Sequence, residues 1–566
     1  MLEEVKFVHR EKILRLGEEI FERWYCNDRD FRDFILSSIL IKNNKVLFVG
    51  LPGAGKSTLV RLIAKAIHND NTEDSTPIFG MTIGSPEKTL QKVLVSTNIV
   101  KLLTSGEEEI IVRPIVKARI KFINEINRFS KSVQDALLSL LEEGYIEYSG
   151  IILRTKSYLC FADMNPFRGD IDRALKARFY ASCYVKLPDF SGSKRIIDYI
   201  LKYTRSEETY LSIPKTMPKI ISINELEEIW KDVQNVEIPE DVRLFGVMIL
   251  SAFRVCKYNK LELMPGYLRL PCTDCEYSNE ICSMIQEPPD ERANIALFLY
   301  GRARAWLYGR RKVIYDDILW AVPYVLAHRI EIKPLTKSRV SNPWEFLRHI
   351  IRNIRETKWI SGSEFGVWAK GLALACRILE IKPSEQIEKT KIINVEKGDK
   401  IEILSQLEKL AIGEFGRGDL VVKEIYRYVQ DIFGEKIKDK KEILQREVRR
   451  LLKDPNLTYS QIEELMQKIN SYPAEISKGV KEKISKLIDS FRIIVNLEAP
   501  IDIKKIENVL ITHGVPSRVV SRLLDKSKAE NMEYRTILLQ IKKIGKNLII
   551  ITETKDLANE IRDSIS

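Results

Sequence analysis

A glycine-rich segment near the start of the chain ends in residues that can hold phosphate and a metal ion. Residues 50–58 are Gly-Leu-Pro-Gly-Ala-Gly-Lys-Ser-Thr and fit the pattern GxxxxGK[ST]. Glycines let such a loop curl so that backbone N–H groups face phosphate oxygens, and the following helix contributes its positive end. We expect Lys56 to contact the outer phosphates of a nucleoside triphosphate and the Ser57 hydroxyl to hold Mg²⁺. The predicted nucleotide-binding residues of the loop are Gly50, Pro52, Gly53, Ala54, Gly55, Lys56, Ser57 and Thr58.

A second polar cluster closes an apolar stretch farther along the chain. Residues 121–127 are Lys-Phe-Ile-Asn-Glu-Ile-Asn, and Glu125 is the candidate to polarise an attacking water. Asn124, a further predicted nucleotide-binding residue, stands where an acid is usual. Its amide can hydrogen-bond a Mg²⁺-bound water, but it brings no negative charge. Two interpretations stay open: Asn124 is a tolerated variant in a working enzyme, or hydrolysis is slow or conditional.

Three further residues complete the candidate catalytic set. Asn165 can orient the attacking water against the γ-phosphate, although Asn-Pro also favours a simple turn. Arg178 can reach a nucleotide bound by a neighbouring subunit, because a planar guanidinium suits the charge of a phosphoryl transition state. Arg292 opens a later helix and can return to the γ-phosphate from there. Each arginine alone is more often a surface ion pair, and the order of the whole set favours catalysis.

Alternating strands and helices must position these side chains. Apolar runs at residues 45–50, 119–123 and 157–162 predict buried parallel strands. Helical periods at residues 57–67 and 132–141 alternate with them. This alternation is typical of a doubly wound parallel sheet, so the predicted fold class is α/β.

As a set, these motifs resemble the MoxR group of AAA+ ATPases over about residues 35–335. The stretch from Arg113 to Glu143 is similar to that family's Walker B strand and the helix after it, and residues 144–150 look like the insert directed toward a ring pore. By the same resemblance, Asn165 matches sensor 1, Arg178 the arginine finger and Arg292 sensor 2.

The resemblance implies a P-loop AAA+ core with a helical lid, and ATP and Mg²⁺ as cofactors. It also implies a homo-oligomer, a hexameric ring with ATP at the subunit interfaces, that remodels client proteins together with a partner bearing a von Willebrand factor A domain. The sequence departs from the family at Asn124, in a cysteine-bearing insertion in the lid, and after about residue 337.

The length of 566 residues exceeds what one hydrophobic core usually supports. We predict an α/β nucleotide-binding core at residues 1–190 and a helical lid at 191–336 with an insertion at 256–286. A helical, charge-rich region follows at 337–490. Residues 491–566 predict two short helices and a hairpin, an order compatible with a winged helix.

Four of the eight cysteines cluster with the spacing C-x15-C-x2-C-x6-C, which can wrap one metal ion or cluster. Zinc and a 4Fe–4S cluster both fit this spacing, and a pair of disulfides is the alternative. The cluster consists of Cys256, Cys272, Cys275 and Cys282. The scattered cysteines, expected to be buried small hydrophobes, are Cys26, Cys160, Cys183 and Cys376.

The composition narrows the setting in which the chain works. The net charge is +12, which fits a nucleic-acid partner, another acidic partner, or a surface rich in both signs of charge. No apolar run approaches the roughly 20 residues that cross a bilayer, and the first residues lack an apolar signal core. We therefore expect no membrane span and a cytoplasmic location.

Three functions compete on these grounds. The leading one is an ATPase that remodels client proteins, as the MoxR resemblance implies. The second is a nucleic-acid motor or loader, suggested by the basic balance and the predicted winged helix, but the predicted pore insert has few basic residues. The third is a scaffold gated by ATP that hardly hydrolyses it, motivated by Asn124.

Overall fold

The computed structural model divides the chain into two compact units, Met1–Tyr428 and Val429–Ser566. The residues that it describes are 7–70, 75–148, 150–155, 158–203, 210–254, 281, 284–338, 340, 342–361, 364–384, 400–412, 419–452, 457–470, 474–496, 503–512, 515–524, 533–535, 539–544 and 547–565. No helix among them is long and apolar enough to cross a membrane.

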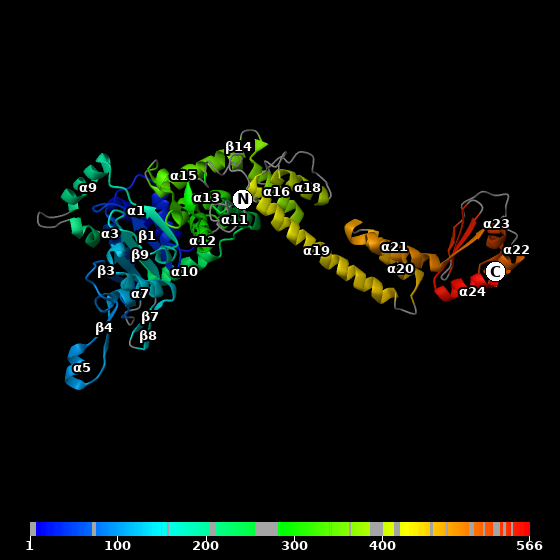
Figure 1. The fold of residues 1–566 in the computed structure, drawn as a ribbon, viewed down its shortest axis with the longest axis horizontal. Coiled ribbons are helices and arrows are strands. Elements are labelled where there is room, and N and C mark those ends of the chain that lie inside the picture. Colours follow the sequence, from blue (N-terminus) through cyan, green and yellow to red (C-terminus); the bar gives the residue numbers. More distant parts are fainter. Residues whose placement is uncertain are drawn as a thin grey trace. The chain divides into compact units, whose positions relative to one another are not determined.

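A five-stranded parallel sheet forms the core of the first unit (Figure 1). Its order is β10-β1-β9-β6-β3, so β9 lies between the strand that precedes the glycine loop and the strand that ends at Asn124. The strands are mostly buried apolar runs, as parallel strands covered on both faces must be. The predicted doubly wound α/β fold is confirmed. The strands are β1 (Asn44–Val49), β3 (Phe79–Ile83), β6 (Ile120–Asn124), β9 (Leu159–Met164) and β10 (Ala181–Tyr184).

Short helices connect the strands, and two helices precede them. Asp28 caps α2 by accepting a hydrogen bond from the Phe31 N–H at 3.2 Å. The helices of this part are α1 (Arg10–Arg23), α2 (Arg29–Ile39), α3 (Lys56–Ala66), α4 (Leu90–Val93), α5 (Ile99–Ser105), α6 (Pro114–Lys117), η1 (Ile126–Arg128), α7 (Lys131–Glu142) and α8 (Arg173–Lys176).

Two hairpins project from this part on the same side, one of them carrying α5 (Figure 1). The Thr97 and Tyr148 hydroxyls, one from each hairpin, are 3.4 Å apart. The second hairpin falls at the insert predicted near residues 144–150. The strands are β4 (Val95–Thr97), β5 (Ile110–Val112), β7 (Tyr145–Tyr148) and β8 (Ile151–Arg154), and a separate parallel pair joins β2 (Ile67–His68) to β11 (Ile221–Ser222).

A helical lid follows the sheet. Phe34 of α2 stacks on Tyr300 and on Tyr324, with ring centroids 5.6 Å and 4.4 Å apart, and so fixes two lid helices against the core. Ser222 and Glu225 form a capping box at the start of α10. The elements are α9 (Phe190–Tyr203), η2 (Tyr210–Thr216), α10 (Ile223–Gln234), α11 (Glu240–Ala252), β12 (Ile285–Glu287), α12 (Arg292–Leu307), α13 (Tyr315–Leu326), β13 (Glu331–Ile332), α14 (Pro334–Lys337) and α15 (Pro343–Asn353).

The rest of the first unit is mostly helical. Buried Trp368 donates its indole N–H to the Asp419 carboxylate, whose oxygens both lie 3.2 Å away. The elements are η7 (Ile354–Trp359), β14 (Ile360–Ser361), β15 (Glu364–Phe365), α16 (Val367–Leu379), α18 (Lys400–Ile412) and α19 (Leu420–Leu452), the last of which continues into the second unit.

The second unit contains a helical cluster and an antiparallel sheet of order β16-β19-β18-β17. Two apolar cores hold them, one led by Leu444 and Phe491 and one by Ile541 and Ile550. Strand β16 precedes the two short helices and belongs to the sheet, and α24 follows β19. These two elements are not part of the predicted order of two helices and a hairpin, and the winged helix stays a prediction. The elements are α20 (Tyr459–Asn470), α21 (Ala474–Ser490), β16 (Arg492–Asn496), α22 (Ile503–Thr512), α23 (Ser517–Leu524), β17 (Glu533–Arg535), β18 (Leu539–Ile544), β19 (Asn547–Thr552) and α24 (Lys555–Ile565).

Candidate nucleotide site

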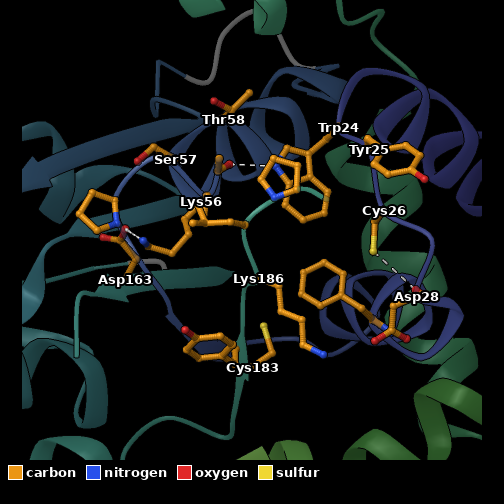
Figure 2. Close-up of a pocket in the computed structure, with 18 of the residues that line it drawn as sticks. Trp24, Tyr25, Cys26, Asp28, Lys56, Ser57, Thr58, Asp163, Cys183 and Lys186 are labelled. Carbon is orange, nitrogen blue, oxygen red and sulfur yellow. Dashed lines mark hydrogen bonds and ion pairs between the residues drawn. The ribbon is translucent and has the colours of Figure 1, made fainter. Parts of the chain in front are cut away.

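A cavity of about 900 Å³ opens at the carboxyl ends of β1, β6 and β9. This is the edge of a parallel sheet at which ligands usually bind. The cavity brings together most of the residues that the sequence singled out, and Figure 2 shows part of its lining. The predicted residues that line it are Pro52, Gly53, Ala54, Gly55, Lys56, Ser57, Thr58, Asn124, Glu125 and Asn165.

The glycine loop between β1 and α3 has a backbone that side chains would obstruct. Gly53 and Gly55 have φ of +83° and +76°, in the left-handed region that favours glycine. A Cβ on Gly50 would lie 2.5 Å from the Val185 carbonyl oxygen, so the loop needs glycine there to pack against the strand end. The curled loop therefore has the shape that a phosphate cradle requires.

Lys56 lies in the cavity wall with only 7% of its surface exposed. Its ammonium group donates to the carbonyl oxygens of Gly50 and Leu51, each at 2.9 Å, and lies 3.7 Å from Asp163 Oδ2 (Figure 2). Burial lowers the pKa of Lys56, and the nearby Asp163 carboxylate opposes that shift. Lys56 is thus a buried cation held at the loop by neutral oxygens and one carboxylate.

Glu125 directly follows β6 and has φ of +52°, a left-handed conformation that is uncommon for a residue with a side chain. Its N–H donates to Asp163 Oδ1 at 2.6 Å, and its carboxylate pairs with Arg128 at 2.6 Å. Gly84 packs so closely against the Glu125 carbonyl that a Cβ there would lie 1.9 Å from it. Such backbone strain, held by close neighbours, is typical of functional positions.

Asn165 follows β9 and is buried. Its Oδ1 accepts a hydrogen bond from the Phe167 N–H at 3.1 Å, and Asn127 donates to its carbonyl oxygen at 3.0 Å. The turn that Asn-Pro favours is therefore present. Because Asn165 also lines the cavity, the turn and the predicted role in orienting water are compatible.

The other end of the cavity is aromatic, and sequence reasoning missed it. The connection between α1 and α2 contributes Trp24, whose indole N–H donates to the Gly55 carbonyl at 3.0 Å and whose ring stacks on Phe31 at 5.4 Å (Figure 2). Tyr25, Tyr324 and Trp344 also line it. A flat apolar base fits such a wall. The signal was present as the run Trp-Tyr-Cys at residues 24–26.

The scattered cysteines follow the prediction only in part. Cys160, Cys183 and Cys376 are buried, as predicted, and burial raises the thiol pKa of Cys160 and of Cys376 to about 12. Cys26 is half-buried and lines the cavity, so its assignment as a core residue is wrong. The physical reason is its place in the connection between two helices rather than inside one.

Arg178 and Arg292 lie together, outside the cavity lining. Both guanidinium groups pair with Glu142 at the end of α7, Arg292 at 2.8 Å. Arg292 is the first residue of α12, and its predicted return to the γ-phosphate stays a prediction. The Phe179 carbonyl next to Arg178 accepts hydrogen bonds from His328 at 2.9 Å and Arg329 at 2.7 Å.

The clustered cysteines, Cys256, Cys272, Cys275 and Cys282, lie outside the described residues, so their metal or disulfide assignment stays a prediction. Within the described residues, no group of three or more His, Cys, Asp or Glu side chains is arranged to hold a metal ion by itself. A Mg²⁺ ion bound through nucleotide phosphates needs few protein ligands, and Ser57 lines the cavity where it would serve as one.

Comparison with known families gives two matches, in the order expected of a core and a lid. Residues 45–179 match the AAA domain of the dynein-related subfamily, and residues 288–344 match the AAA lid domain. The first match begins at β1 and ends just after Arg178; the second contains Arg292.

Individual relatives are distant but cover much of the chain. An uncharacterised protein of Bacillus subtilis, YeaC, is 25% identical over 351 residues, which are 61% of this chain and 94% of that protein. Chaperone MoxR1 of Mycobacterium tuberculosis is 24% identical over 51% of this chain and 68% of its own length. Protein MoxR of Methylorubrum extorquens is 22% identical over 62% of this chain and 95% of its own length.

Proposed function

Since the chain is an AAA+ protein of the MoxR group, with an AAA domain and an AAA lid, we propose that it hydrolyses ATP to remodel or mature client proteins. One observation carries the proposal: Lys56, Glu125 and Asn165, which are far apart in the sequence, line one cavity at the end of the sheet. A cation, a carboxylate and an amide at one phosphate cradle match the needs of phosphoryl transfer.

Mg²⁺ and ATP fit the residues present. The loop glycines leave the cradle free of side chains, Lys56 lies at its wall, and Ser57 and Asn124 line the same space. Lys56 would contact the outer phosphates, Ser57 would hold the ion, and the aromatic wall at Trp24 and Tyr25 would cover the base. The ion supplies charge neutralisation on the phosphates when it is bound.

The protein's own groups then act on the attacking water. The Glu125 carboxylate would accept a hydrogen bond from the water and take its proton, after turning from Arg128 with which it pairs at 2.6 Å. The Asn165 amide would orient the same water. Position 124, where an acid is usual, carries an amide that brings no negative charge to this site.

Arg178 and Arg292 would act on the nucleotide of a neighbouring subunit. Their shared contact with Glu142 lies outside the cavity lining of their own chain. This placement supports a homo-oligomer with composite sites, and the family resemblance suggests a hexameric ring. A partner bearing a von Willebrand factor A domain rests on that resemblance alone.

The exposed tip of the β7–β8 hairpin supports a protein client over a nucleic acid. Ile151 and Ile152 are 48% and 56% exposed. A hairpin that tracks a phosphate backbone should present basic side chains instead. ATPase activity stimulated by DNA, with binding that falls steeply as salt rises, would favour the nucleic-acid alternative.

The direct test is the Glu125→Gln variant. It should bind ATP like the wild type, hydrolyse it about 10²–10⁴-fold more slowly, since a general base is lost, and retain its client in a pull-down with ATP. Lys56→Ala is the control that should bind neither ATP nor client. Wild-type protein that binds no ATP, or Glu125→Gln that hydrolyses it normally, would refute the proposal. ATP binding without turnover, restored by Asn124→Asp, would instead indicate a scaffold.

A further inference from the structure

The cavity contains an acid that the sequence motifs do not assign. Asp163 is the fifth residue of β9, is 4% exposed, and lines the same cavity as Lys56 and Asn124. Its Oδ1 accepts the Glu125 N–H at 2.6 Å, and its Oδ2 lies 3.7 Å from Lys56 Nζ (Figure 2). A carboxylate is costly to bury unless it has partners or a function.

The sheet register places Asp163 beside Asn124. Adjacent strands β6 and β9 are parallel, with Ile123 opposite Ala162, so residues 124 and 163 follow at the same level. Side chains at one level of a parallel sheet lie on one face. An acid at position 163 is therefore one strand away from position 124 and on the same side of the sheet.

We propose that Asp163 supplies, from β9, the carboxylate that Asn124 lacks at the end of β6, and that it serves as the acid of the phosphate and Mg²⁺ site. This inference rests on the proposed ATP site. P-loop enzymes pair the loop hydroxyl with one acid at Mg²⁺, and here an amide ends β6 while the acid lies on the adjacent strand β9.

Other carboxylates in the lining have different partners. Asp28 caps α2, Asp189 accepts the Gly192 N–H at 2.7 Å, and Glu345 pairs with Lys186 at 2.9 Å. Glu125 is the candidate base. Among these carboxylates, Asp163 contacts both Lys56 and the backbone N–H of Glu125. It therefore also fixes the positions of Lys56 and Glu125 relative to each other.

The experiment compares Asp163→Asn, Asn124→Asp and the double exchange Asn124→Asp/Asp163→Asn, with Asp170→Asn as a control. Asn at position 163 retains an acceptor for the Glu125 N–H, and Asp170 lies outside the cavity lining, paired with Lys176. Three quantities are measured. They are the melting temperature without nucleotide, the increase in melting temperature that ADP or ATP causes as Mg²⁺ is titrated, and the ATPase rate.

Asp163→Asn should raise the Mg²⁺ concentration for half-maximal stabilisation by about 10–100-fold, the usual effect of losing a carboxylate close to a metal. The double exchange should recover most of that loss, and Asp170→Asn should match the wild type. Unchanged Mg²⁺ dependence in Asp163→Asn would overturn the inference. Tighter binding of Mg²⁺ and nucleotide by Asp163→Asn would also overturn it, because Asp163 would then only keep Lys56 from the phosphates.

The inference would also be overturned if the double exchange did not restore the Mg²⁺ dependence and Asp163→Asn lowered the melting temperature without nucleotide. Asp163 would then be a purely structural partner of Lys56. These results are separable from failure of the ATP site itself. If that site were wrong, the wild type would show no stabilisation by nucleotide at any Mg²⁺ concentration.

Discussion

Two glycines of the phosphate loop share a backbone conformation but differ in surroundings. Gly53 and Gly55 both have positive φ, so a side chain strains the backbone at either position. A Cβ on Gly55 would lie 2.6 Å from Trp24 Nε1, whereas one on Gly53 would meet nothing within 4 Å. Steric conflict with the aromatic wall is therefore specific to Gly55.

We predict that Gly55→Ala weakens ATP binding much more than Gly53→Ala. Gly53→Ala should cost about 1–2 kcal/mol of unfolding free energy from backbone strain, while Gly55→Ala must also displace Trp24 from the loop. Thermal unfolding and titration with a fluorescent ATP analogue measure both effects. Equal losses in the two variants would show that Trp24 has no part in shaping the loop.

Single residues also show which parts of the candidate site can be predicted from the sequence. Lys56, Ser57, Glu125 and Asn165 could be placed in one site because their motifs follow apolar strands, and parallel strands end at one edge. Asp163 stood in the same motif as Asn165, yet its meaning depends on β9 lying between β1 and β6. Strand order is a tertiary property that no local pattern encodes.

At the scale of elements, the β7–β8 hairpin carries two isoleucine side chains, Ile151 and Ile152, that are about half exposed. Replacing Ile151 and Ile152 with Ser should change the unfolding free energy by only about 0.5 kcal/mol each, as is usual for exposed positions. The basal ATPase rate should stay unchanged, while stimulation by a client should fall. Stimulation equal to that of the wild type would remove the hairpin from client contact.

The turn after α13 ties the lid to the sheet through a buried, neutral histidine. The Phe179 carbonyl can only accept, so His328 Nε2 donates to it, and Nδ1 accepts from the Ser182 hydroxyl at 2.9 Å. Burial, together with the neighbouring Arg329, lowers the pKa of His328 well below 6.5. The imidazole therefore stays neutral in the folded chain.

This link predicts a pH dependence with a definite sign. Below pH 6.5 the unfolded chain binds a proton at His328 and the folded chain does not, so stability falls by up to about 1.4 kcal/mol per pH unit. Above pH 6.5 the contribution is fully present. Unfolding of the wild type and of His328→Gln between pH 7.5 and 5.5 should converge as the pH falls; parallel curves would contradict the neutral assignment.

At the scale of the whole molecule, the candidate catalytic residues form two separate groups. Lys56, Glu125 and Asn165 line the cavity, whereas Arg178 and Arg292 meet at Glu142 outside its lining. The sequence could order these residues along a core and a lid, but it could not show that residues 178 and 292 converge. Arg292, the first residue of α12, meets Arg178 at Glu142, and the proposed action of both arginines between subunits follows from this placement only as a prediction.

The most direct measurement is the ATPase activity of a mixture of two variants, each expected to be nearly inactive alone. Glu125→Gln lacks the base and Arg178→Ala lacks the arginine, so each alone should hydrolyse ATP poorly. In mixed oligomers, some interfaces join the intact Glu125 of one subunit to the intact Arg178 of the other. ATPase activity should therefore reappear on mixing, with differently tagged subunits co-purifying. Mixed oligomers as inactive as either variant would contradict a site shared between subunits.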